Sequence, residues 1–139
     1  MTQMVFINLP VADLPKAMQF YTAIGFRNEP KFTDDTAAAM QLSDAIVVML
    51  ITLPRWATFT DRPLPPAGSS EVMNCLSCDS RETVDRLTEA AKTAGGAADI
   101  NPSQDHGFMY GRSFTDPDNH VWEVVWMDPA AAPHPQQDQ

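Results

Sequence analysis

Positive charge is scarce in this sequence. Its 139 residues include 9 Lys and Arg against 18 Asp and Glu, which gives a formal net charge of −9. Proteins that bind phosphate backbones or anionic lipid surfaces use clustered Lys and Arg. We therefore expect neither a nucleic-acid partner nor a membrane partner.

Long apolar runs are also missing. The longest strongly apolar stretch, residues 45–53, is far too short to cross a bilayer. The opening residues, MTQMVFINLP, have no basic start followed by an apolar stretch, as a signal peptide would. These features predict a cytoplasmic protein.

Cysteine is limited to Cys75 and Cys78, in a C-x-x-C spacing. That spacing suggests a redox pair or half of a zinc site, but the chain has no second ligand pair. On one strand, residues three apart point to opposite faces, so the two thiols could not share a metal or form a bridge. We predict two small buried residues without chemistry.

Two short segments resemble each other: FINLPVAD aligns with VMNCLSCD, which puts Asn8 on Asn74 and Asp13 on Asp79. In each half a strand precedes a capped helix. Asp13 and Pro15 start the first helix and Gly25 ends it, while Asp79 and Glu82 form a capping box for the second. The other predicted strands are 26–32, 36–42, 45–53, 97–101, 108–115 and 120–127, with first strands at 4–11 and 71–78.

Between the halves lies a proline-rich linker, residues 53–69, which we expect to lack regular structure. It carries Trp56 and Phe59, which either pack on the core or cover a pocket. We therefore predict an α+β fold of tandem βαβββ modules, about 4–52 and 70–127, forming a curved mixed sheet around a cup. Residues 1–127 make one domain and 128–139 a mobile tail.

A tandem βαβββ chain with these motifs resembles the vicinal oxygen chelate superfamily. Its members include glyoxalase I, extradiol dioxygenases, fosfomycin-modifying enzymes and bleomycin-binding proteins. The chain looks most like a bacterial lactoylglutathione lyase-like subgroup. The motifs are V-x-D-L…FY…GF, at Val11, Asp13, Leu14, Phe20, Tyr21, Gly25 and Phe26, and DPD-x-H-x-W-E, at Asp116, Pro117, Asp118, His120, Trp122 and Glu123.

The resemblance implies that four inward-facing side chains hold one divalent ion in metal-dependent relatives. Here the matching positions are Phe6, Met49, either Val72 or Met73, and Glu123. Only Glu123 is a donor for a hard cation, so we expect no metal cofactor. The alternative is a different metal site, in which His106 and Glu123 bind the ion with the help of Asn8 or Asn74.

Strand alternation predicts which side chains face the cup. Asn8, Asn74 and Glu123 would be its polar members. We expect Glu123 to act as a catalytic base or acceptor, with Asn8 and Asn74 orienting a small substrate. The alternative is that the two amides bind strand backbone or each other. The apolar members would be Phe6, Pro10, Val72, Leu76, Val121 and Val125.

A second polar group follows the loop QDHG. His106 is a candidate catalytic residue beside the cup mouth. Tyr110 and Arg112 share one strand face, and similar strands in fosfomycin-modifying relatives present such residues to an anion. The alternative for Arg112 is a salt bridge to an acid such as Asp105. His120 belongs to the turn motif and is expected to be structural.

Two functions follow from these residues. One is a glyoxalase-type lyase, isomerase or other enzyme that modifies a small molecule. The other is a metal-free protein that sequesters a hydrophobic or drug-like molecule, to which Trp56 would contribute. For either function we expect a small-molecule ligand and a homodimer.

Overall fold

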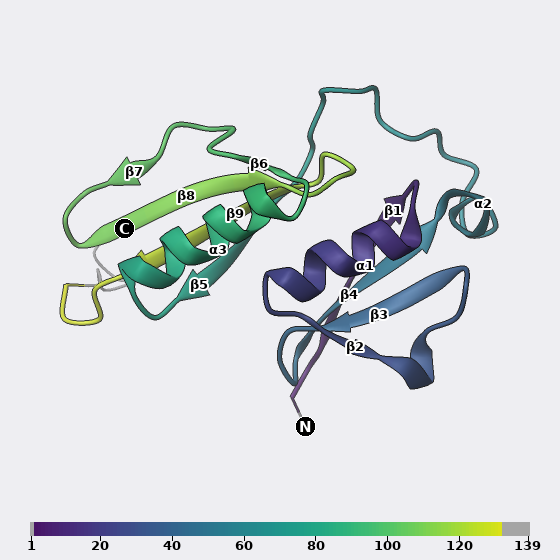
Figure 1. Ribbon diagram of the computed structural model, residues 1–139, viewed down its shortest axis with the longest axis horizontal. Helices are drawn as coiled ribbons and strands as arrows, with labels where there is room; N and C mark the ends of the chain where they lie inside the picture. The colour runs from purple at the N-terminus through teal and green to yellow at the C-terminus, as the bar shows by residue number, and fades with distance from the viewer. Residues whose placement is uncertain (1, 132–139) are drawn as a thin grey trace.

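The computed structural model describes residues 2–131, and the chain forms an α+β fold of two βαβββ modules (Figure 1). The end of the predicted tail, 132–139, lies outside the described residues. Module 1 contains β1 Val5–Val11, α1 Leu14–Ala23, β2 Arg27–Glu29, the short 3-10 helix η1 Pro30–Phe32, β3 Ala37–Gln41 and β4 Ile46–Thr52. Module 2 contains β5 Met73–Cys78, α3 Arg81–Thr93, β6 Ala97–Ala98, β7 Gln104–Asp105, β8 Met109–Thr115 and β9 Val121–Met127.

Each module builds its own mixed sheet. The strand orders are β1-β4-β3-β2 and β5-β9-β8-β6, with β7 paired to β8. The first strand of each module runs parallel to the last, and the remaining pairs are antiparallel. In Figure 1, α1 and α3 both lie in front of their sheets. We call the other side of each sheet its open face.

Local signals explain the first helix. The side chain of Asp13 accepts a hydrogen bond from the Lys16 N–H, and Pro15 occupies the first turn, where its missing donor costs nothing. Gly25 follows the helix with a φ of 108°, a value that favours glycine. The predicted start and end of this helix are confirmed. Its buried face consists of Leu14, Ala17, Phe20 and Tyr21.

The closing motif joins the two modules through a buried group that we call the junction: Tyr21, Asp116 and Trp122. The Tyr21 hydroxyl donates to Asp116 Oδ2 at 2.6 Å and accepts from Trp122 Nε1 at 3.0 Å. Asp116 also accepts from the backbone N–H groups of Asp118 and His120. Burial and the nearby Asp116 carboxylate raise the pKa of Tyr21, and burial raises the pKa of Asp116.

Two backbone contacts extend the junction. The ring Nε2 of His120 donates to the Pro10 carbonyl at 2.7 Å, and Asp118 Oδ1 accepts from the Ala12 N–H at 2.9 Å. Both bonds connect the turn before β9 to the end of β1. His120 therefore has the structural position predicted for it.

Five local predictions are wrong. The predicted strand 26–32 is a strand only over β2 and continues as η1, and the predicted loop QDHG contains β7. The linker contains a short helix, α2 Leu53–Trp56, because Pro54 falls in its first turn, where proline is tolerated. The N-cap of α3 is Ser80, which accepts from the Thr83 N–H, rather than Asp79. Cys75 is exposed, since it lies on the open face of β5, while Cys78 is half-buried on the other side.

Among residues 2–131, no helix has both the length and the apolar character that crossing a membrane requires.

Candidate ligand-binding site

The cap of α3 fixes how the two modules correspond. Asn8 pairs with Met49 across β1 and β4, and Cys75 pairs with Glu123 across β5 and β9. Cys75, rather than Asn74, is therefore the counterpart of Asn8. The predicted repeat alignment is wrong by one residue, because Ser80 caps the helix one position later than expected.

This register places Asn74 on the helix side of β5, away from Glu123. The helix-side neighbours of Asn74, Leu76 and Cys78, pack against the core. The predicted set of Asn8, Asn74 and Glu123 around one cup is not assembled. Asn8 and Glu123 do face the open side, each on its own module.

The register also identifies the four positions that hold the ion in metal-dependent relatives. They are Phe6 and Met49 in module 1 and Met73 and Glu123 in module 2, since Met73 precedes its helix cap by the same interval as Phe6. A phenyl ring and two thioethers cannot bind a hard divalent cation. The residues do not fit the ion. Within 2–131 there is also no group of three or more His, Cys, Asp or Glu placed to hold a metal.

Two apolar hollows lie on the open face of module 1 and share Met49. One, of about 320 Å³, is also lined by Phe6 and Phe32, and the other lies under α2. This α2 cavity has a volume of about 260 Å³. Its floor comes from three strands and its overhang from α2 with the turn that follows. The turn is ordered by backbone bonds from Ala57 to Leu53 and from Phe59 to Trp56. The lining residues are Asn8, Ala37, Met49, Ile51, Arg55, Trp56, Phe59 and Thr60.

Trp56 thus lies where the pocket-covering interpretation of the linker placed it. The Arg55 guanidinium lies over the Phe59 ring, 5.2 Å from its centroid. Arg55 is a lining residue that sequence reasoning did not name. The available signal was an arginine directly before Trp56 and four residues before Phe59, but only the α2 helix, which we did not predict, brings all three to the cavity.

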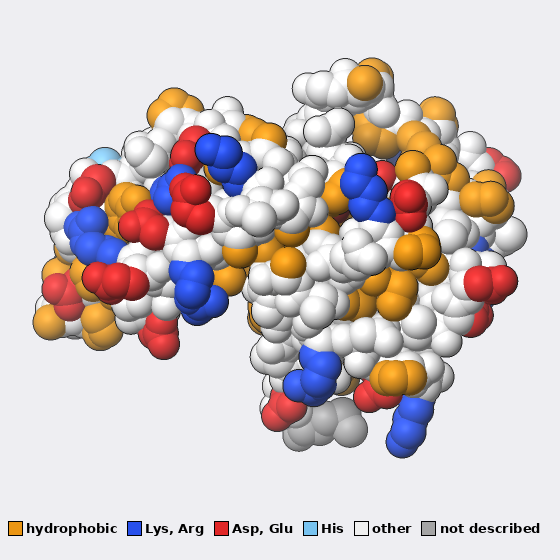
Figure 2. Space-filling model, viewed as in Figure 1, with side chains coloured by type: hydrophobic (Ala, Val, Ile, Leu, Met, Phe, Trp, Pro, Cys, Tyr) orange, Lys and Arg blue, Asp and Glu red, His pale blue; other side chains and the backbone are white. Residues whose placement is uncertain are grey.

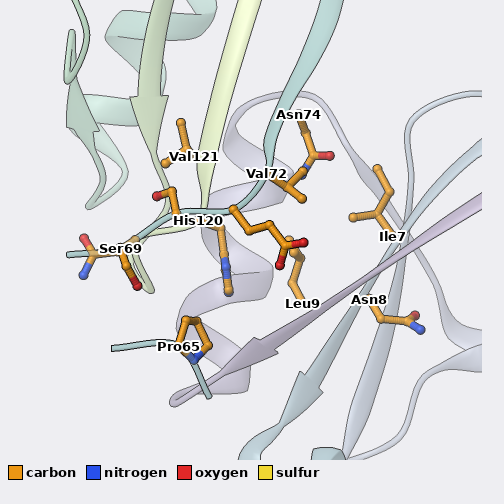
Figure 3. A pocket seen from close by; sticks show the side chains of 12 residues that line it. Ile7, Asn8, Leu9, Pro65, Ser69, Val72, Asn74, His120 and Val121 are labelled. Atoms are coloured by element: carbon orange, nitrogen blue, oxygen red, sulfur yellow. The ribbon is translucent and has the colours of Figure 1, made fainter. Parts of the chain in front are cut away.

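A second hollow lies between the modules, beneath the linker (Figure 3). Its volume is about 230 Å³, and both β1 and β5 contribute to its wall. Figure 3 shows that the Asn8 side chain points away from His120, whereas the Leu9 side chain lies between β1 and the ring. The predicted residues Asn8 and Asn74 both line this hollow, without Glu123, and its other polar lining residues are Ser69, Ser70, Glu71, Asn119 and His120. The Nε2 of His120 is already bonded to Pro10.

Glu123 is half-buried on the open face of module 2. It lines a small cavity of about 110 Å³ together with Gln104, Asn101 and Ser113, the last being its cross-strand partner. Partial burial and the neighbouring Glu123 carboxylate raise the pKa of the Cys75 thiol. His106 does not line this cavity, so the two predicted catalytic residues are not brought together. His106 Nε2 lies 3.2 Å from Gln104 Oε1, on an exposed loop.

Tyr110 and Arg112 share a strand face as predicted, but that face is covered by α3. Arg112 is bonded to Asp85, Glu89 and Asp99 at 3.0, 2.7 and 2.8 Å. These four residues form what we call the ion cluster. Figure 2, viewed from the helix side, shows acidic and basic side chains mixed over α3.

This arrangement corrects the expected anion-binding role of Tyr110 and Arg112. The Tyr110 hydroxyl donates to Asp85 at 2.6 Å, and every direction of the Arg112 fork meets a carboxylate. Hydrogen bonds from Arg112 lower the pKa of Asp99, and those from Tyr110 and Arg112 lower the pKa of Asp85. The salt-bridge alternative holds for Arg112, although with these acids rather than Asp105.

Asp105 has a different partner. Arg81 binds it through both terminal nitrogens and stacks on the rings of Tyr110 and Trp126. Chiefly because of the Arg81 hydrogen bonds, the pKa of Asp105 falls to about 2.

Comparison with known proteins agrees with this fold. The model of the Glyoxalase/Bleomycin resistance protein/Dioxygenase superfamily matches residues 3–124. A hypothetical protein from S. aureus is 30% identical, with 91% of this chain and 94% of that chain covered and a TM-score of 0.76. No curated protein matches the chain.

More distant solved structures share the fold. A glyoxalase-related enzyme from Fulvimarina pelagi is 19% identical over 91% of this chain and 88% of that one, with a TM-score of 0.75. A fosfomycin resistance protein from Mesorhizobium loti is 18% identical over 94% and 93%, with a TM-score of 0.63. At these identities the likeness concerns the fold alone.

Proposed function

Because the chain belongs to the Glyoxalase/Bleomycin resistance protein/Dioxygenase superfamily, yet carries Phe6, Met49 and Met73 at ion-binding positions, we propose that it binds a small, mostly apolar molecule without a divalent ion. The observation that carries the proposal is this exchange of donors for apolar side chains on the open face. It removes the charge that would hold an oxygen-rich substrate. It also leaves a surface suited to a carbon-rich one.

The α2 cavity is the place we assign to that ligand. At about 260 Å³ it is slightly smaller than the pockets that hold drug-sized molecules, which start at about 300 Å³. Apolar contacts would come from Met49, Ile51 and Trp56, and Met49 can adjust its shape to the ligand. The bound molecule would be a sequestered ligand rather than one transformed at a metal.

Thermal unfolding tests this proposal. Chelator-treated protein is heated with Ni, Zn, Mn, Co or Fe ions, and separately with a panel of small neutral aromatic compounds. A ligand of the native state at a hundredfold excess over its Kd stabilises it by about 2.7 kcal/mol. We expect compounds from the aromatic panel to raise Tm and the metals to leave it unchanged.

Two variants locate the binding. Met49→Trp fills the α2 cavity and should abolish the shift, whereas Thr93→Trp, on the exposed surface of α3, should preserve it. A metal that raises Tm in the wild type but not in Glu123→Gln would overturn the proposal.

Catalysis by Glu123 is the second candidate function. Its support is that Glu123 faces the open side with Ser113 opposite and a small cavity beside it. In that case Glu123 would serve as a general base for a very small substrate. Glu123→Gln should abolish turnover of such a substrate while leaving ligand binding in the α2 cavity intact, and full activity of that variant would remove the role.

We also propose that two chains pair through their open faces. The α2 cavity is walled by module 1 with the linker, and the cavity beside Glu123 is walled by module 2 alone. Large apolar side chains remain exposed on both open faces, including Phe6 at 55% and Met73 at 54%. A second copy would place its module 2 opposite module 1 and close the cup. Light scattering should report a dimer for the wild type and for Thr93→Asp on α3, and a monomer for Phe6→Asp. A monomeric wild type would refute the pairing.

A further inference from the structure

The α2 cavity combines an apolar floor with one cationic group. Arg55 is the only charged residue among those that line it. This is unusual for a chain with 18 acidic and 9 basic residues. A cavity that excludes the more abundant charge and includes the scarcer one is selective for anions.

Arg55 also differs from the other buried or stacked arginines. Arg81 and Arg112 are both saturated by carboxylates. Among residues 2–131, no carboxylate oxygen lies within 4.0 Å of the Arg55 guanidinium. The pKa of Asp34 is lowered mainly by hydrogen bonds from Thr36, and Arg55 contributes only weakly to that shift.

The position of Arg55 is set by its neighbours. Stacking on Phe59 holds the guanidinium plane beside the cavity, and α2 holds Trp56 next to it. Guanidinium groups pair with carboxylates through two parallel N–H bonds, and a stacked guanidinium keeps its edge free for such a pair. The Asn8 carboxamide, exposed on the floor, adds a second polar contact.

From this geometry we infer that the ligand of the α2 cavity is a small aromatic monocarboxylate. Its ring lies on Met49 and Ile51 beside Trp56, and its carboxylate binds Arg55. This inference rests on the proposed function and adds the ligand class. It also explains why the cavity is lined by a single arginine rather than by several charges, since one carboxylate needs only one partner.

A pair of probes that differ in charge tests the inference. 2-Naphthoate and 2-naphthalenemethanol have the same ring system, and only the first carries a carboxylate. Isothermal titration calorimetry should give a Kd for the acid that is at least about tenfold lower than for the alcohol, a difference of about 1.4 kcal/mol. Raising the salt concentration should weaken binding of the acid and leave binding of the alcohol unchanged.

Variants of the linker arginines identify the group responsible. Arg55→Gln should bring the two Kd values together, and Arg55→Lys should retain part of the difference because the charge remains. Arg62→Gln is the matched control, since Arg62 is an exposed linker arginine outside the lining of the cavity. Each of these side chains is exposed, so folding should not change, and circular dichroism checks this.

The outcomes separate the two proposals. If the alcohol binds as tightly as the acid in the wild type, or if Arg55→Gln retains the preference, the ligand class is wrong while metal-free binding stands. If neither probe binds and Met49→Trp changes nothing with any member of the aromatic panel, the proposed function falls as well.

Discussion

The two modules share one topology and one core but differ in the polarity of their faces. In module 1 the helix side is the dry centre of the molecule, because α1 packs against β9 and the closing motif of module 2. In module 2 the helix side adds Val84, Phe114 and Trp122 to the same core, but farther along β8 it becomes polar. There the ion cluster, built on Arg112, joins β8 to α3.

The open faces also differ in polarity. Module 1 presents apolar floor residues with one cation, and module 2 presents Glu123, Ser113 and Cys75. The comparison teaches that duplication preserves strand order without preserving polarity. Each face has the chemistry required by what packs against it, so a residue in one module does not inherit the role of its counterpart.

The largest expected effect comes from breaking the junction. Asp116→Ala leaves the buried Tyr21 hydroxyl and two backbone N–H groups without their acceptor. Leaving buried donors unpaired costs about 1–3 kcal/mol each, so we expect a loss of about 3 kcal/mol in the free energy of unfolding. Urea unfolding followed by circular dichroism measures it.

A control variant shows whether the loss of stability is specific to Asp116 or follows from removing any acid of the closing motif. Asp118→Ala removes only the bond to the Ala12 N–H and should cost about 1 kcal/mol. If Asp116→Ala were within about 0.5 kcal/mol of the wild type, the junction would not be the dry centre that the comparison assumes.

A smaller loss is expected from the ion cluster. Arg112→Met keeps an apolar stem against the sheet but removes the partner of three carboxylates. Because the Arg112 side chain is 12% exposed while the acids are about half exposed, we expect a loss of about 2 kcal/mol rather than the larger cost of a fully buried pair. Arg81→Met, which breaks a more exposed pair, should lose less under the same urea titration. An equal loss of stability in both variants would contradict the larger contribution that we assign to Arg112.

Sequence reasoning succeeded where the signals were local. Asp13, Pro15 and Gly25 each set the α1 boundary through their own backbone chemistry. On β9 the alternation of Trp122 and Val124 with Glu123 fixed the outward direction of the carboxylate, because two large apolar side chains on one face leave a single orientation.

It failed where two answers were locally equivalent. Asp79 and Ser80 can each cap a helix, and the sequence of β5, MNCLSC, lacks a clear alternation of apolar and polar residues that would have chosen between them, although exposure alternates along the strand in the fold. Because Ser80 caps α3, the register of β5 shifts by one residue, and Asn74 does not lie on the open face. For Tyr110 and Arg112, spacing showed that they share a face but could not show which one. The pairing of Arg112 with Val124 across β8 and β9 decides that.

Acid should weaken the ion cluster selectively. The pKa values of Asp85 and Asp99 are lowered in the folded protein, chiefly by hydrogen bonds from Tyr110 and Arg112 respectively. A lowered folded-state pKa contributes stability above the unfolded value, about 3.9, which is lost as the pH falls through the folded value. The stability difference between wild type and Arg112→Met should therefore shrink from pH 7 to pH 3.

Asp116 contributes with the opposite sign. Burial raises its folded-state pKa, so its contribution is present below the unfolded value and is lost as the pH rises through the folded value. Urea titrations at pH 7, 5 and 3 on the wild type, Arg112→Met and Asp116→Asn separate the two effects. A wild type minus Arg112→Met difference that stays constant with pH would show that the cluster acids do not depend on Arg112.

The smallest expected effect concerns the polar open face of module 2. Cys75 is exposed and next to Glu123, and its thiol pKa is raised by partial burial first and by that carboxylate second. Since the thiolate is the reactive form, removing the charge in Glu123→Gln should speed reaction of Cys75 with a maleimide by about twofold at pH 7. Both proteins should also carry Cys78→Ser, so that the measured rate is that of Cys75 alone. An unchanged rate would mean that Glu123 points away from Cys75, and the polar face of module 2 would then consist of separate groups rather than one site.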